Sequence, residues 1–518
     1  MRIKQQMGIV FNLDKCLGCQ TCTIACKNVW TNREGAEYMF WNNVETKPGA
    51  GYPKEWENQT KYRGGWKQDG TEGAEAPKLN QASKFWEMIS LFYNPVLPQM
   101  DDYYGKGPFT FTYEDLHSEE PTKYSQPVAR PKSQITGEED IELTYGVNWE
   151  DNGAGTHEEG TGKLDYNFSD MTPAARQALL KFENSFMMYL PRICNHCLNP
   201  ACVGSCPSGA NYKREEDGVV LIDQDRCRGW RYCVSGCPYK KVYYNWRTGK
   251  SEKCILCFPR IETGQPPMCF QACVGRIRYM GPLLYDLDRV AEVANTANEK
   301  DIVARHREII LNPFDPEVIA EAKKQGVSDN WLEACRRSPV YKMFVEWEIA
   351  LPLHPEFRTL PSLFYIPPES PVQTAKPNDR GTMDMVDGGT VLPDLKEFRI
   401  PIEYLARLLA AGNTKLVETA LSRQLALREF RRQERVEGRV DESILEAVGL
   451  TVEQARHMHR LLALAHFHER FVIATARSED TDNAPYLERG FTGYDLLAPE
   501  SAPRRRTEFH GNKMGVGS

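Results

Sequence analysis

Four closely spaced runs of cysteine constrain this chain more than any other feature of its 518 residues. Fifteen of its sixteen cysteines fall in these runs, and Cys335 stands apart from them. The first run holds Cys16, Cys19, Cys22 and Cys26; the second holds Cys194, Cys197, Cys202 and Cys206; the third holds Cys227, Cys233 and Cys237; the fourth holds Cys254, Cys257, Cys269 and Cys273. The N-terminal residues resemble neither a signal peptide nor a twin-arginine segment, so we expect reduced thiols. Clustered intracellular cysteines are typically metal ligands.

The first run, CLGCQTCTIAC, has the C-x2-C-x2-C-x3-C spacing of bacterial ferredoxins. Three cysteines on one tight loop can hold three iron corners of a cubane. The fourth lies on the following helix, points away, and serves the other cluster of a pair. Four runs therefore predict two pairs of runs that exchange their fourth cysteines, and four clusters in all.

The third run, CRGWRYCVSGC, has a tryptophan at the place of one cysteine. Its lead-in DQDRC matches NLDKC before Cys16, so the two runs form an internal repeat in which Trp230 stands at the position of Cys19. An indole cannot replace a thiolate, which predicts a 3Fe–4S cluster beside Trp230 and 4Fe–4S clusters elsewhere. Fifteen cysteines supply this set. We expect the 3Fe–4S cluster to have the highest potential; the alternative is a degenerate site without a cluster.

Two other classes of protein compete with this interpretation. Structural zinc sites show two separated CxxC or CxxH pairs, which the runs do not resemble. A free-standing polyferredoxin carrier needs neither the long insertion nor the helical C-terminal region. Metal analysis distinguishes an iron–sulfur protein from a zinc protein, and gel filtration distinguishes a subunit of a complex from a free-standing carrier. We expect Cys335 to be a buried small hydrophobe.

Net charge and hydropathy argue against two other kinds of protein, one that binds nucleic acid and one that spans a membrane. The net charge of −7 argues against nucleic-acid binding, and no apolar run is long enough to cross a bilayer. We therefore expect membrane contact only through a partner. Basic residues surround the third and fourth runs in RCRGWRYC, YKKVYY and RTGKSEKC. They either raise the cluster potentials or lie on a solvated face.

We expect an α+β chain with two ferredoxin-like two-cluster modules. Residues 1–30 with 240–285 form one module with two 4Fe–4S clusters, and 191–239 form the other, with one 4Fe–4S and one 3Fe–4S. A loop-rich insertion spans 31–190, a helical region 290–480 and an extended tail 481–518. Hairpins are predicted around Asp217-Gly218 and in KVYYNWRTGKSEKC, and helices at residues 290–310, 402–413 and 414–435.

The chain resembles the iron–sulfur β subunits of membrane-bound respiratory nitrate reductases. The resemblance extends over nearly its whole length. It includes the strings WNNVETKPG, FENSFMMYLPRICNHCLNPAC, CRGWRYCVSGCPYKK, GKSEKCILCFPRIETGQP, CVGRIRYMG, SPVYKM and LPLHPEFRTLP. These strings are longer and more specific than a general ferredoxin signature.

The resemblance implies a ligand set for each cluster. Three 4Fe–4S clusters take Cys16, Cys19, Cys22 and Cys273; Cys26, Cys254, Cys257 and Cys269; and Cys194, Cys197, Cys202 and Cys237. The 3Fe–4S cluster takes Cys206, Cys227 and Cys233, with Trp230 at the open corner.

The resemblance also implies partners. A membrane γ subunit with b-type haems oxidises quinol, and this chain passes the electrons to a molybdenum-containing α subunit that reduces nitrate to nitrite. The chain itself then has no catalytic residue, and it lies at the cytoplasmic face of the membrane as a peripheral subunit. The alternatives are the β subunit of nitrite oxidoreductase, in which the same clusters carry electrons in reverse, or of perchlorate or selenate reductase.

Overall fold

The computed structural model describes residues 1–36, 38–69, 76–80, 165–169, 171–173, 188–369, 402–438 and 440–474. Most of the insertion expected at 31–190 and all of the tail expected at 481–518 lie outside these residues. The described chain has mixed helix and sheet content, as the sequence predicts for an α+β protein.

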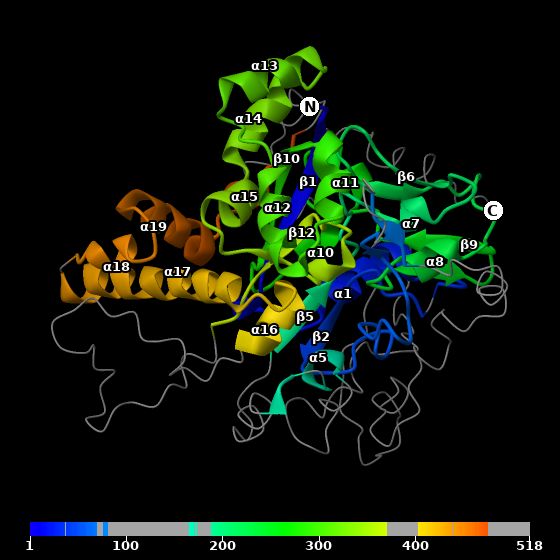
Figure 1. Ribbon diagram of the computed structural model, residues 1–518, viewed down its shortest axis with the longest axis horizontal. Coiled ribbons are helices and arrows are strands. Elements are labelled where there is room, and N and C mark those ends of the chain that lie inside the picture. Colours follow the sequence, from blue (N-terminus) through cyan, green and yellow to red (C-terminus); the bar gives the residue numbers. More distant parts are fainter. Residues whose placement is uncertain are drawn as a thin grey trace, which may run out of the picture.

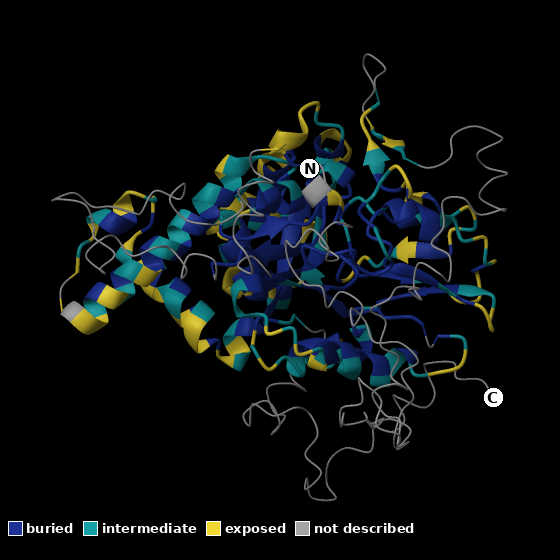
Figure 2. Ribbon diagram, turned by 90° about the horizontal axis from the view of Figure 1, so that it is seen from below, coloured by how far each residue is buried: buried dark blue, intermediate teal, exposed yellow. Residues whose placement is uncertain are grey.

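A four-stranded sheet joins segments that are far apart in the sequence. Its order is β10 (Arg278–Asp286), β1 (Ile3–Asn12), β12 (Leu363–Ile366) and β11 (Leu351–Pro352). β1 is antiparallel to β10 and parallel to β12. β10 is buried along its whole length, and helices α14 (Asp329–Arg337) and α15 (Pro339–Tyr341) pack against it. The sheet therefore forms part of the core (Figure 2) rather than a surface layer.

Both hairpins predicted from the sequence are present. β6 (Asn211–Lys213) pairs with β7 (Val220–Ile222), and β8 (Val242–Asn245) pairs with β9 (Lys250–Lys253), each antiparallel. In the first turn Gly218 has a φ of 70°, a conformation that glycine adopts without strain. A third, shorter pair joins β3 (Trp66–Lys67) and β4 (Lys78–Leu79).

Short helices accompany the cysteine runs. They are α1 (Thr21–Cys26), α7 (Ala201–Gly204), α8 (Tyr232–Gly236), α9 (Phe258–Ile261) and α10 (Met268–Gln271). In Figure 1, α7 and α8 lie on the opposite side of β1 from the longer C-terminal helices.

The chain after β10 is largely helical, as predicted. Its helices are α11 (Val290–Ala294), α12 (Ile302–Glu308), α13 (Pro316–Lys324), α14 (Asp329–Arg337), α15 (Pro339–Tyr341), α16 (Ile402–Leu409), α17 (Thr414–Arg432), α18 (Ser443–Glu446), α19 (Val452–His459) and α20 (Phe467–Arg470). α16 and α17 confirm two of the predicted helices. Cys335 on α14 is buried, which confirms its expected place in the core.

The prediction of one helix over 290–310 is wrong. α11 ends before Asn295, and α12 begins only at Ile302. Between them the Asn298 side chain accepts a hydrogen bond from the backbone N–H of Lys300 and starts a separate 3-10 turn. Asparagine favours such local side-chain hydrogen bonds over a helix interior, which explains the break.

Within the described residues, every helix is too short or too polar to cross a lipid bilayer.

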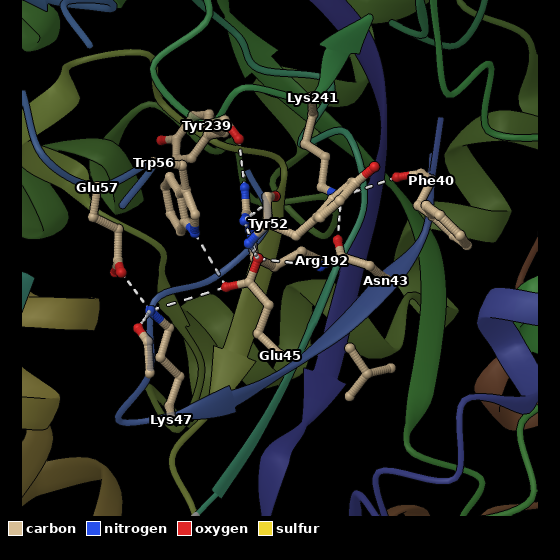
Figure 3. A network of polar contacts seen from close by, with 12 residues as sticks. Phe40, Asn43, Glu45, Lys47, Tyr52, Trp56, Glu57, Arg192, Tyr239 and Lys241 are labelled. Atoms are coloured by element: carbon tan, nitrogen blue, oxygen red, sulfur yellow. Dashed lines mark hydrogen bonds and ion pairs between the residues drawn. The ribbon is translucent and has the colours of Figure 1, made fainter. Parts of the chain in front are cut away.

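A buried network of charges holds the two ends of the insertion together (Figure 3). β2 (Asn43–Lys47) and β5 (Met188–Arg192) pair antiparallel beneath it. The Lys47 ammonium forms ion pairs with Glu57, with Asp165 at 3.5 Å and with Glu45 at 3.9 Å. Glu45 also pairs with Arg192, and all of these side chains are at most 2% exposed.

The same network extends into the C-terminal half of the chain. The Tyr404 hydroxyl on α16 donates a hydrogen bond to Asp165 at 2.8 Å. His354 lies between Glu57, 2.8 Å from its Nε2, and Glu356, 2.7 Å from its Nδ1. α16 also contacts α5 (Tyr166–Ser169), so the described part of the insertion is anchored to both halves of the protein.

Replacement of Lys47 by methionine tests this anchor. Lys47→Met removes the ammonium group that pairs with several buried carboxylates and leaves their negative charge uncompensated. We therefore expect a loss of roughly 3–5 kcal/mol in the free energy of unfolding. Lys324→Met is the control, because it breaks an exposed pair with Glu321 on α13. That change should leave the free energy of unfolding nearly unchanged in the same urea titration, because solvent screens an exposed pair. Equal losses in the two variants would contradict a stabilising role for the network.

The His354 site predicts a stability that depends on pH. Burial by itself lowers the pKa of His354, but the charge of Glu356 and hydrogen bonds to Glu356 and Glu57 raise this pKa from 6.5 to about 9. The folded chain thus keeps a proton that the unfolded chain loses. The stabilisation is complete below pH 6.5 and is lost as the pH rises to about 9, a change of roughly 3 kcal/mol.

The test compares the thermal unfolding of the native chain with that of His354→Gln between pH 6 and pH 9.5. The variant should be less stable than the native chain at pH 6, and this difference should shrink as the pH rises. A difference that stays constant over the whole range would show that His354 does not titrate in this way.

Candidate iron–sulfur centre

The first and third cysteine runs adopt the same backbone conformation. Gly18 and Gly229 have φ values of 65° and 69°, and Gln20 and Arg231 have values of 56° and 62°. Gln20 and Arg231 are also the N-cap residues of α1 and α8. The internal repeat predicted from the lead-in sequences is therefore present in the structure.

Trp230 occupies the loop position that Cys19 occupies in the other copy of this repeat. Both side chains are exposed, and the indole is 51% accessible. The glycine before Trp230 packs against the β8–β9 turn: a Cβ on Gly229 would lie 2.3 Å from the carbonyl oxygen of Gly249. The frame around the tryptophan is thus as closely built as the frame around a cysteine.

The second and fourth runs form another internal repeat, which sequence reasoning missed. His196 and Leu256 both have positive φ, at 43° and 52°, in the middle of their CxxC segments. Farther along, Pro200 and Pro267 are the N-caps of α7 and α10. Each of these helices carries one cysteine, and a second cysteine follows the helix. α7 carries Cys202 and is followed by Cys206, and α10 carries Cys269 and is followed by Cys273. The signal was the shared P-x-C-x3-C spacing, hidden by loops of different length.

The short helices show which runs are neighbours. α1 of the first run packs against α10 of the fourth, and α7 of the second run packs against α8 of the third. α9 follows Cys257 directly, with Cys257 itself in the left-handed conformation at its N-cap. These contacts bring cysteines together that are separated by up to about half of the sequence.

The charges of several thiols raise the pKa values of other thiols, which indicates which cysteines are neighbours. Burial raises the pKa of Cys26, and the charges of its neighbours Cys269, Cys254 and Cys257 raise it further. Burial also raises the pKa of Cys16, Cys202 and Cys233, each with thiol neighbours of its own. The neighbours are Cys22 and Cys273 for Cys16; Cys237, Cys194 and Cys197 for Cys202; and Cys206 and Cys227 for Cys233.

The donor atoms suit iron–sulfur clusters. All sixteen cysteines are free thiols, and each of the four runs contributes three or four of them. Most of these thiols are buried, and Cys19 is exposed on the loop of the first run. Among the described residues, no three Cys, His, Asp or Glu side chains converge closely enough for a single metal ion.

Hydrogen-bond donors point at several of these sulfur atoms. The Trp30 indole N–H donates to Cys257 Sγ at 3.1 Å, and the Lys253 ammonium donates to Cys194 Sγ at 3.5 Å. Backbone N–H groups of Leu256 and Ser251 donate to Cys254 and Cys227 at 3.4 and 3.5 Å. Such bonds stabilise negative charge on sulfur and raise the potential of a cluster bound there. Nothing in the sequence pattern distinguished Trp30 for this role.

The basic residues near the runs divide into two kinds. Arg228 is exposed, as a solvated face would require, whereas Lys240, Lys241 and Lys253 are at most 2% exposed. None of these three lysines forms an ion pair with a carboxylate in the described part of the chain; their ammonium groups donate to carbonyl, amide, hydroxyl or sulfur atoms. Burial lowers the pKa of Lys240 to about 7, an effect that the charge of Cys237 opposes.

The thiol sets, their donors and the buried cations define a class: an iron–sulfur protein that transfers electrons. Two family models match the chain, a 4Fe-4S dicluster domain at residues 185–283 and the respiratory nitrate reductase beta C-terminal model at residues 370–452.

Curated proteins match over most of the chain. The respiratory nitrate reductase 1 beta chain of Escherichia coli (strain K12) is 53% identical over 479 residues, 92% of this chain and 91% of that protein. The nitrate reductase beta chain of Bacillus subtilis (strain 168) is 50% identical over 493 residues, 95% of this chain and 98% of that one. The selenate reductase subunit beta of Thauera selenatis is 36% identical and covers 80% of this chain and 90% of its own length.

The chain belongs to the family of respiratory nitrate reductase beta chains. It is therefore an electron-transfer subunit of an oxidoreductase, and the family implies further subunits. This confirms the resemblance recognised in the sequence.

Proposed function

We propose that this chain relays electrons from a haem b membrane subunit that oxidises quinol to a molybdenum catalytic subunit that reduces nitrate to nitrite. Three 4Fe–4S clusters and one 3Fe–4S cluster carry the electrons. The chain is peripheral, at the cytoplasmic face of the membrane, and contacts the membrane through its haem-containing partner. The observation that carries the proposal is the grouping of buried thiols into four sets in a member of this family.

The proposed ligand sets are those implied by the family resemblance. The first cluster has Cys16, Cys19, Cys22 and Cys273; the second has Cys26, Cys254, Cys257 and Cys269; the third has Cys194, Cys197, Cys202 and Cys237; the fourth, with three irons, has Cys206, Cys227 and Cys233. The thiols that act on one another electrostatically support this division. The contacts of α1 with α10 and of α7 with α8 support two modules of two clusters each.

Interactions between the sets support a linear order of clusters. Cys22 of the first set raises the pKa of Cys269 in the second, and Cys194 of the third set raises the pKa of Cys254 in the second. α8 carries Cys233 of the fourth set, and Cys237 of the third set caps the same helix. We infer that electrons pass through the clusters in the order of this chain of neighbours, with the first and fourth clusters at its ends.

The bound clusters would supply one-electron transfer, and the protein supplies ligands, hydrogen bonds and exclusion of water. Burial of most thiols keeps water from the clusters, and the donors at Cys257, Cys194, Cys254 and Cys227 raise their potentials. Such clusters can conduct in either direction. Identities of 50–53% to nitrate reductase beta chains, against 36% to a selenate reductase subunit, favour nitrate as the substrate of the partner.

The proposed function is tested on the complex purified from its native membrane. It should contain iron and acid-labile sulfide, show four cluster signals in EPR, and reduce nitrate with a quinol analogue as the donor. A complex that oxidises nitrite but fails to reduce nitrate would support the nitrite oxidoreductase alternative. A lone stable chain on gel filtration would support a free carrier instead.

Trp230→Cys tests the 3Fe–4S assignment. The new thiolate stands at the position of Cys19 in the repeated frame, so it should bind a fourth iron. We expect the oxidised 3Fe–4S EPR signal to decrease and the potential of that centre to fall, because one more anionic ligand stabilises the oxidised state.

The matched control is Trp230→Phe, which keeps an aromatic ring and adds no ligand. Its oxidised 3Fe–4S signal should remain. If the cysteine and phenylalanine variants have the same EPR spectrum as the native complex, Trp230 does not determine the type of this cluster.

A further inference from the structure

A buried arginine near the first and fourth cysteine runs forms no ion pair with a carboxylate in the described part of the chain. Arg278 begins β10 and its side chain is 0% exposed. Its Nη2 donates to the Asn42 side chain at 2.7 Å, while Nε and Nη1 have no hydrogen-bond partner in the described part of the chain. A guanidinium carries five donors and stays charged, so its burial without an anion is costly.

Aromatic rings alone do not compensate for this cost. The guanidinium carbon lies 4.3 Å from the centre of the Phe11 ring and 5.5 Å from that of Phe270. Cation–π contacts of this kind offset only part of the free-energy cost of burying an ion. A nearby anion is therefore required.

The groups that act most strongly on Arg278 as anions are four thiols. In order of their effect they are Cys22, Cys269, Cys273 and Cys16, and together they raise its pKa against the opposing effect of burial. Three of these thiols belong to the first proposed cluster and Cys269 belongs to the second. The geometry agrees, because the guanidinium contacts the ring of Phe270, which follows Cys269 of the second set, and β10 begins five residues after Cys273 of the first set.

Two features hold the guanidinium in this place. The Asn42 side chain accepts from Nη2, and the Asn42 backbone amide acts to lower the pKa of the Cys26 thiol of the second set, against the larger effect of burial. On the other side, Arg278 pairs with Phe11 in the antiparallel register of β1 and β10. The side chain is therefore fixed by the sheet and by a loop that touches the second set.

The second module has no such cation at the equivalent position. Arg278 follows Cys273 by five residues and opens β10, and Asn211 follows Cys206 by five residues and opens β6. The Asn211 amide donates to the carbonyl oxygen of Cys202 at 3.1 Å. The repeat therefore carries a buried positive charge in one module and a neutral amide in the other.

We propose that Arg278 is the shared counter-cation of the first and second clusters, which raises both of their reduction potentials and reduces the repulsion between them. The inference rests on the ligand sets of the proposed function. Since the charge faces three thiols of the first cluster and one of the second, its effect is greater on the first cluster. The potential of an iron–sulfur cluster depends on local charge, and Arg278 supplies a buried positive charge.

The test is an EPR-monitored redox titration of the purified complex with Arg278→Met. The equilibrium constant for reduction should fall at least tenfold at the first cluster, a shift of about 59 mV to lower potential. The second cluster should shift in the same direction by less. The remaining 4Fe–4S cluster and the 3Fe–4S cluster should keep their native potentials.

Two further variants separate charge from structure. Arg276→Gln removes the same charge from an exposed side chain two residues away, and solvent screening predicts a smaller shift than in Arg278→Met. Arg278→Lys keeps the charge on a shorter side chain with fewer donors, so its shifts should be intermediate and confined to the same two clusters. If the complex with Arg278→Met does not assemble its clusters, Arg278→Lys tests the inference instead, by whether its potential shifts are confined to the first and second clusters.

Several outcomes would overturn the inference. Unchanged potentials in the Arg278 variants, or equal shifts at all four clusters, exclude a local counter-cation. A shift in Arg276→Gln as large as that in Arg278→Met shows a general charge effect. If instead the native complex lacks four cluster signals, the proposed function fails before the variants are compared.

Discussion

Negative charge buried on sulfur is the constraint on which the rest of this structure depends. The cysteine runs bring most of fifteen thiols into the interior, and as ligands these would be thiolates in an environment that disfavours charge. Such a core is stable only if cations and hydrogen-bond donors are buried with it. Lys240, Lys241, Lys253 and Arg278 are buried basic side chains without carboxylate partners within the described residues, and the Lys253 ammonium donates directly to Cys194 Sγ.

The second requirement is that distant segments converge. Each proposed cluster takes cysteines from two runs, so the first 26 residues must meet residues 254–273. The sheet provides this meeting, because β1 leads into the first run and pairs with β10, which follows the fourth run. In addition, the network of Lys47, Glu57 and His354 joins β2 to the C-terminal half of the chain. The cluster region is thus held between two sets of long-range contacts.

Repetition with small differences gives the clusters different properties. The first and third runs share a backbone, yet one has Cys19 and the other Trp230 at the same loop position. The second and fourth runs share another, yet one is followed by Asn211 and the other by Arg278. Identical sites would have similar potentials, so such differences can separate the potentials of the proposed clusters. Ligand number and local charge are two independent ways to separate them.

The sequence by itself determined the kind of chemistry. Ligand spacing is a local property, so the four runs, the repeat that includes Trp230, the two hairpins and helices α16 and α17 could all be read from neighbouring residues. The helix expected over 290–310 was misjudged because the competing hydrogen bond of Asn298 is invisible to periodicity. Only the tertiary structure decided which basic residues are buried, that Trp30 donates to Cys257, and that Arg278 faces two thiol sets. These features depend on contacts between segments more than 200 residues apart, such as Trp30 with Cys257 and Arg278 with Asn42, and no local pattern encodes them.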